Sequence, residues 1–151
     1  MPTILSTLPF PLIQAPMAGV QGVELTLAVC RAGALGSLPA AMLSPEQLAT
    51  ALARLNTENQ GAPYNVNFFA HTVPTVTDEQ RVAWLAQLQP YFTEWGLDPT
   101  AIPQHHGRQP FDEAALQLIE QYRPPVVSFH FGLPTAKLLA AVKATGAEVW
   151  S

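Results

Sequence analysis

Short apolar runs alternate along the chain with longer segments in which apolar residues recur every three or four positions. The short runs are rich in β-branched and aromatic residues and are typical of buried strands. They cover residues 12–15, 34–38, 64–69, 126–131 and 148–151. The longer segments have the spacing of amphipathic helices. They cover residues 23–32, 44–60, 79–95, 111–122 and 135–144. The pattern therefore predicts five strands that alternate with helices.

Local signals indicate where some of these helices begin and end. Ser44, Pro45 and Gln47 occupy the N-cap, N1 and N3 positions of a capping box. Gly33 stands where a glycine commonly ends a helix. Pro90 is expected to interrupt the helix over 79–95, because its ring clashes with the preceding turn. The proline-containing residues 96–110 are predicted to form a surface excursion.

The alternation of strands and helices implies parallel pairing, since parallel neighbours need a crossover connection. Both an open doubly wound sheet and a (β/α)-barrel satisfy this rule. The turn after the first strand reads Ala15-Pro16-Met17-Ala18-Gly19 and lacks the Gly-x-Gly-x-x-Gly fingerprint of the open sheet. A complete barrel needs about 250 residues, whereas this chain has 151. We expect α/β architecture: a partial TIM (β/α) barrel with the first four to five units, so that residues 1–151 form the N-terminal part of one domain whose C-terminal units are missing.

Composition narrows the classes of function. Charged residues make up 12% of the chain, against roughly 25% in an ordinary domain. The net charge of -4 and only seven Lys and Arg residues argue against nucleic acid as a partner. Cys30 is the only cysteine, which excludes an internal disulfide and makes a weak candidate nucleophile. Because Pro9 and Pro11 interrupt the N-terminal apolar run and no basic segment precedes it, we expect neither a signal peptide nor a membrane span, and a cytoplasmic protein by default.

Candidate binding residues follow the predicted strands. Pro16 presets its backbone φ, and Met17 offers a polarisable apolar surface. Asn67 can donate and accept hydrogen bonds, and Asn65 is expected on the same strand face. Each residue also has a purely structural alternative. Pro16 can simply form a turn, and Met17 can pack in the core. The Asn67 amide can satisfy the backbone of a loop.

His130 lies near the end of a predicted strand, where its imidazole could hydrogen-bond an anionic substrate or a cofactor. Strand alternation places Ser128 on the same face, with Phe129 and Phe131 on the other. A structural hydrogen bond is the alternative role for His130.

The remaining histidines, His71, His105 and His106, match no motif and are interpreted as solvated. The adjacent pair has no companion at ligand spacing, so we expect no metal site.

Four motifs in chain order resemble the N-terminal part of the nitronate monooxygenase (2-nitropropane dioxygenase) family. They are Gln14-Ala15-Pro16-Met17-Ala18-Gly19, Ala32-Gly33-Ala34-Leu35-Gly36-Ser37-Leu38, Asn65-Val66-Asn67 and Ser128-Phe129-His130-Phe131-Gly132. Together they extend over nearly the whole chain.

The resemblance implies an FMN across the C-terminal ends of the strands, contacted by Ala15, Pro16, Met17 and Asn67, with His130 at the substrate site. It implies oxidation of alkyl nitronates with O2 by the complete enzyme. The family's proton-abstracting histidine and its phosphate-binding glycine loops match nothing in these residues. We therefore expect no catalytic base here and an inactive chain when it is alone.

Two further readings stay open. Other FMN-dependent TIM-barrel oxidoreductases, such as enoyl reductases, share a similar first loop. Alternatively, the chain is a non-catalytic half-barrel that self-associates through its open strand edges.

Overall fold

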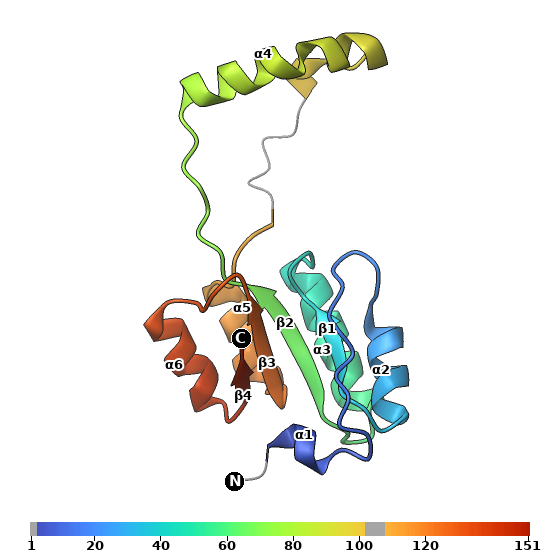
Figure 1. Ribbon diagram of the computed structural model, residues 1–151. Helices are drawn as coiled ribbons and strands as arrows, with labels where there is room; N and C mark the ends of the chain where they lie inside the picture. The colour runs from blue at the N-terminus through green and yellow to red at the C-terminus, as the bar shows by residue number, and fades with distance from the viewer. Residues whose placement is uncertain (1–2, 102–107) are drawn as a thin grey trace. The chain divides into compact units, whose positions relative to one another are not determined.

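The computed structural model describes residues 3–101 and 108–151. The chain separates into two compact units, Met1–His71 with Arg108–Ser151, and Thr72–Gly107. The first unit contains all the strands of the described residues (Figure 1). The second is an insertion between the second and third of these strands.

The first unit is built on a four-stranded parallel sheet. Its strands are β1 (Gly36–Pro39), β2 (Tyr64–Phe69), β3 (Val126–His130) and β4 (Glu148–Trp150). They pair in the order β1-β2-β3-β4, the order in which they occur along the chain. A doubly wound sheet reverses its strand order at a switch point. The described strands show no reversal, so the sheet has the order of a (β/α)-barrel wall, as predicted.

Four helices form the crossovers and outer layer of this unit (Figure 1). They are α2 (Val23–Arg31), α3 (Pro45–Glu58), α5 (Glu113–Tyr122) and α6 (Ala136–Ala144). The predicted capping box of α3 is confirmed, with Ser44 and Gln47 bonding each other's backbone amides. A short α1 (Ile4–Thr7), which the pattern did not predict, is tied to β4 by a 2.7 Å bond from the Ile4 amide to Glu148.

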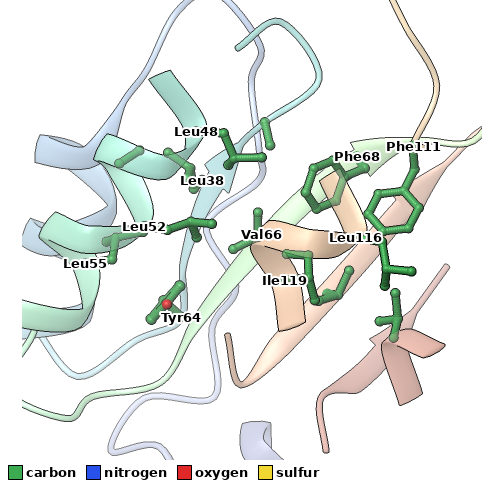
Figure 2. Packing of buried hydrophobic residues seen from close by; sticks show 14 of the residues in the cluster. Leu38, Leu48, Leu52, Leu55, Tyr64, Val66, Phe68, Phe111, Leu116 and Ile119 are labelled. Carbon is green, nitrogen blue, oxygen red and sulfur yellow. The ribbon is translucent and has the colours of Figure 1, made fainter. Parts of the chain in front are cut away.

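One set of alternating strand positions builds the hydrophobic core. Leu38, Val66, Phe68 and Phe129 pack against apolar residues from all four helices. Figure 2 shows Val66 and Phe68 beside Leu52, Leu116 and Ile119. The other set carries Ser37, Asn65, Asn67 and Ser128, so the opposite face of the sheet is polar.

Gly36 permits the close approach of α2 to β1. A Cβ atom at this position would lie 2.2 Å from the Thr26 carbonyl oxygen and 2.9 Å from Cys30 Sγ. Any side chain would therefore separate the helix from the strand.

The prediction of a first strand over residues 12–15 is wrong in extent. Only a single parallel bridge, between Ile13 and Leu35, forms there. Pro11 and Pro16 flank the segment and donate no backbone hydrogen bond, which limits the ladder. The strand expected over 126–131 also ends one residue early, because Phe131 has a φ of 67°.

The inserted unit holds α4 (Asp78–Trp95) and a 3-10 turn, η1 (Pro99–Ala101). Thr77 and Gln80 form a capping box, and Gly96 ends the helix in the left-handed conformation. The expected interruption at Pro90 is wrong, since α4 runs through this residue without a break. Residues 102–107, which contain His105 and His106, lie outside the described residues.

Candidate functional site

The polar face of the sheet carries a hydrogen-bonded cluster at the carboxyl ends of β2 and β3. Asn67 pairs with Ser128 in the strand register, two residues before His130. Its Nδ2 donates to Ser128 Oγ at 2.9 Å and to the Ser128 carbonyl oxygen at 3.2 Å. Asn67 is only 2% exposed, whereas His130 is exposed. The cluster thus joins a buried amide to an accessible imidazole.

Asn67 can support either neutral tautomer of His130. The Nδ1 atom of His130 lies 3.0 Å from Asn67 Nδ2 and 3.2 Å from Asn67 Oδ1. If Nδ1 carries the proton it donates to Oδ1, and if it does not it accepts from Nδ2. Asn67 therefore holds the ring through Nδ1 and leaves Nε2 available to a ligand.

Asn65 lies on the same face, as predicted, but serves a different neighbour. Its Nδ2 donates to Ser37 Oγ at 3.0 Å, and it is 2% exposed. Its Oδ1 has no hydrogen-bond partner among the described residues. The polar face therefore contains a buried acceptor, Asn65 Oδ1, that no described residue uses.

An aromatic group surrounds the end of β2. The Phe69 and Phe131 rings are 4.9 Å apart in an edge contact, and His71 contacts both rings at 6.2 and 6.4 Å between centroids. The guanidinium carbon of Arg108 lies 5.7 Å from the centre of the Phe69 ring, within cation–π range. His71 is half-buried, so its interpretation as a solvated residue is wrong.

Phe131 departs from the expected alternation. Its positive φ rotates it out of the strand, so it contacts Phe69, while Phe129 packs with Phe111 and Phe68 in the core. A bulky residue in this conformation costs about 1–3 kcal/mol and is retained mainly where the surroundings require it. Strain of this kind is concentrated at functional sites.

The loop that carries Ala15, Pro16 and Met17 follows the bridge at Ile13. Ala15 is exposed, Pro16 is half-buried and Met17 is 46% exposed. Because parallel neighbours end at the same edge of a sheet, this loop leaves from the edge that bears Asn67 and His130. Within the described part of the chain, no hydrogen bond or ring contact joins the loop to either residue. Met17 is not a core residue.

The residues at this edge have the chemistry that a flavin ring requires. Such a ring binds an apolar surface together with a few hydrogen-bonding groups. Met17 offers the apolar surface, and the backbone amides of Met17, Ala18 and Gly19 form no hydrogen bond within the described residues. The donor set therefore fits the ring end of a flavin.

Cys30 is not part of this site. It is buried beside the Pro63 carbonyl oxygen at 3.4 Å, and burial raises the pKa of its thiol above the ordinary range. Among the described residues, no group of three or more His, Cys, Asp or Glu side chains is arranged to hold a metal ion. No described helix is both long and apolar enough to cross a membrane.

Sequence reasoning missed several residues at this edge. Gln14, Gln21 and Ser37 form hydrogen bonds beside the loop, and Arg108 lies over Phe69. The two glutamines bracket the Ala-Pro-Met loop, a spacing that was available as a signal. No sequence signal pointed to Arg108, because its partner Phe69 is far away in the chain.

Fold and site together define an α/β protein of the (β/α)-barrel type with a polar site at the carboxyl edge of its strands. The chain belongs to the nitronate monooxygenase family, whose model matches residues 2–150. It is 36% identical to the nitronate monooxygenase of Paraburkholderia phytofirmans over 90% of this chain and 37% of that relative. It is also 36% identical to the nitronate monooxygenase of Pseudomonas aeruginosa, over 92% of this chain and 40% of that relative. The chain thus spans about two fifths of the length of these relatives.

Solved structures also share the fold, among them the following two. The nitroalkane oxidase from Streptomyces ansochromogenes matches with a TM-score of 0.74 at 30% identity, covering 97% of this chain and 41% of that protein. FabK from Thermotoga maritima matches with a TM-score of 0.60 at 21% identity, covering 96% and 34%. The second likeness shows the fold alone.

Proposed function

We propose that this chain supplies the first part of an FMN-dependent enzyme that oxidises alkyl nitronates with O2. The observation that carries the proposal is the Asn67–Ser128–His130 cluster, formed by two of the motifs that resemble the family. It lies at the strand edge where barrel enzymes place their sites. The family match over residues 2–150 supports the same assignment.

The loop and Asn67 would hold the flavin, which supplies the redox chemistry when bound. Met17 would cover the ring, and the unpaired amides of residues 17–19 would hydrogen-bond acceptors at its edge. Asn67 Nδ2 donates to Ser128, and either Nδ2 or Oδ1 bonds His130 Nδ1, so Oδ1 is the atom that keeps a lone pair for the cofactor. Asn67 therefore contributes more through His130 than through direct contact.

His130 would orient the substrate. A nitronate is a small anion, and an imidazole Nε2–H donates a hydrogen bond to such a group. We assign no proton abstraction to the described residues, because none of them matches the proton-abstracting histidine that the family resemblance implies. We expect the 151-residue chain alone to bind FMN weakly and to show no turnover.

A chimera tests the proposal. The matched segment of the Paraburkholderia phytofirmans enzyme is replaced by residues 2–150, and bound flavin and nitronate-dependent O2 consumption are measured. We expect a flavin-containing, active protein. His130→Leu should reduce kcat/KM about tenfold or more, because leucine cannot donate the charge-assisted hydrogen bond to the nitronate. The exposed Gln117→Met should leave both readouts unchanged.

A chimera that folds without flavin would contradict the proposal. Flavin-dependent reduction of an enoyl thioester, without nitronate oxidation, would instead favour the enoyl reductase alternative.

We also propose self-association through the edge of the sheet. β4 pairs only with β3 among the described strands, and an unpaired strand edge promotes association. Molecular mass should rise with concentration in size-exclusion chromatography with light scattering. A constant monomer mass would contradict this.

A further inference from the structure

The chain before β1 leaves the sheet abruptly after its single bridge. The Leu35 amide donates to the Leu12 carbonyl at 2.9 Å, and the Gln14 amide donates to the Leu35 carbonyl at 2.9 Å. A continuing strand would next bond the backbone of Ser37. The backbone of residues 15–20 does not do so.

Two glutamine side chains bond Ser37 instead. The Ser37 amide donates to Gln14 Oε1 at 3.0 Å, Gln14 Nε2 donates to Gln21 Oε1 at 2.8 Å, and Gln21 Nε2 donates to the Ser37 carbonyl at 2.9 Å. The three bonds form a closed ring in which each group donates once and accepts once. Gln14 Nε2 also donates to the Ala15 carbonyl oxygen.

A side-chain amide has the same donor and acceptor as a peptide group, so the two glutamines can replace the missing ladder. Backbone groups of a buried strand residue need such partners. Ser37 is fully buried, and its carbonyl also accepts from Thr26 Oγ1 at 3.1 Å. The ring therefore satisfies β1 while the main chain departs.

The glutamines stand at the two ends of the departing loop. Gln14 precedes residue 15 and Gln21 follows residue 20, and both are tied to one strand residue. Inside the loop, the Val20 amide donates to the Met17 carbonyl at 3.2 Å. The loop is thus fixed at its base, and its tip exposes Met17.

We propose that Gln14 and Gln21 are positioning residues whose amide ring on Ser37 releases the 15–20 loop from the sheet and presents its backbone to a ligand. The assignment of a flavin as that ligand rests on the proposed function. The ring and its effect on the loop do not depend on it.

Hydrogen exchange measured by mass spectrometry on the 151-residue chain tests the ring. Gln14→Met and Gln21→Met keep side-chain length but remove the amides. Among the described amides of residues 15–21, only that of Val20 donates a hydrogen bond. Each variant should speed its exchange about tenfold or more, the effect of losing the three side-chain bonds of Gln14 or the two of Gln21, while β2 stays protected. The exposed Gln117→Met is the matched control and should change neither. Unchanged loop exchange, or equal loss of protection in β2, would overturn the proposal.

An atom-specific readout separates positioning from general stabilisation. In amide NMR spectra, Gln14→Met should expose the Ser37 N–H to exchange, whereas Gln21→Met should leave it protected. Gln14→Glu retains an acceptor for this N–H and should restore its protection, although it still cannot donate to Gln21. Equal behaviour of the three variants would refute the ring.

The flavin arm uses the chimera described above. Gln21→Met should lower its flavin content relative to the Gln117→Met control. If exchange responds as expected but the unsubstituted chimera lacks flavin, the proposed function fails and the ring stands. If the chimera binds flavin but neither glutamine variant alters exchange, the ring fails and the proposed function stands.

Discussion

Helices α4 and α5 begin in similar ways but differ in what their side chains contact. Thr77 caps α4 and Asp112 caps α5, each by accepting a backbone amide of the first turn. The 10-residue α5 buries Leu116 and Ile119, whereas the 18-residue α4 buries none of its residues. Local capping is therefore enough to define a helix, but only α5 contributes apolar burial to the stability of its unit.

The largest expected difference comes from truncating apolar side chains. Ile119 is fully buried, so Ile119→Ala should lower the free energy of unfolding by about 2–5 kcal/mol through lost burial and a cavity. Trp84 is 61% exposed, so Trp84→Ala should change it by less than about 0.5 kcal/mol. Urea unfolding followed by circular dichroism measures both. A large loss from Trp84→Ala would show that α4 is packed in solution.

A methyl group added to glycine gives the next effect. Gly36→Ala forces α2 away from β1 and should cost about 1–3 kcal/mol of global stability. Gly96 ends α4 with a φ of 63° and has no atom within 4 Å of an added Cβ. Gly96→Ala should strain only that helix end by about 1 kcal/mol. The same urea midpoint for wild type and Gly36→Ala would contradict the close packing.

The two capping boxes offer a smaller but cleaner contrast. Ser44→Ala in α3 should lower global stability by about 1 kcal/mol, because α3 is packed in the core. Thr77→Ala removes the same kind of cap from α4 and should reduce helical ellipticity without moving the urea midpoint of the sheet unit. If both variants shift that midpoint equally, the two units unfold together.

The smallest effect concerns pH. Because burial raises the pKa of Cys30, the unfolded thiol ionises at lower pH than the folded one. Stability from this group is full below the ordinary thiol range and should fall as pH rises through it. The contribution of Cys30 is obtained by comparing wild type with Cys30→Ala at pH 7.5 and 9.5. Burial also raises the pKa of Tyr64, but both proteins contain that residue, so its effect cancels. A wild-type loss equal to that of the variant would contradict the assignment.

Most of the first unit was accessible from the sequence because its signals are local. The apolar periodicity located α2, α3, α5 and α6, and the alternation of Asn65 with Asn67 and of Ser128 with His130 assigned the polar face. The parallel order followed from the crossovers. The family resemblance then gave the expectation that Met17, Asn67 and His130 lie at one edge of the sheet.

The misses share a physical cause. The ladder after Ile13 ends where Pro16 offers no backbone donor and the side chains of Gln14 and Gln21 bond Ser37 instead. Hydrophobic periodicity does not register such side-chain bonds. Pro90 does not break α4, since a helix tolerates the loss of one bond when its other turns hold. Phe131 leaves the strand through a backbone conformation that its residue type disfavours. In each case a tertiary or strained arrangement overrides the local preference.

The chain on either side of residues 72–107 is fixed at one place in the sheet unit. The Ala70 amide donates to the His130 carbonyl at 2.9 Å, and the Phe111 amide donates to the Phe69 carbonyl at 2.7 Å. The segments that precede and follow the insertion are therefore both held beside Phe69, whatever lies between them. Such an insertion behaves as an interchangeable module: evolution or design can lengthen, shorten or exchange it while the register of β2 and β3 stays the same.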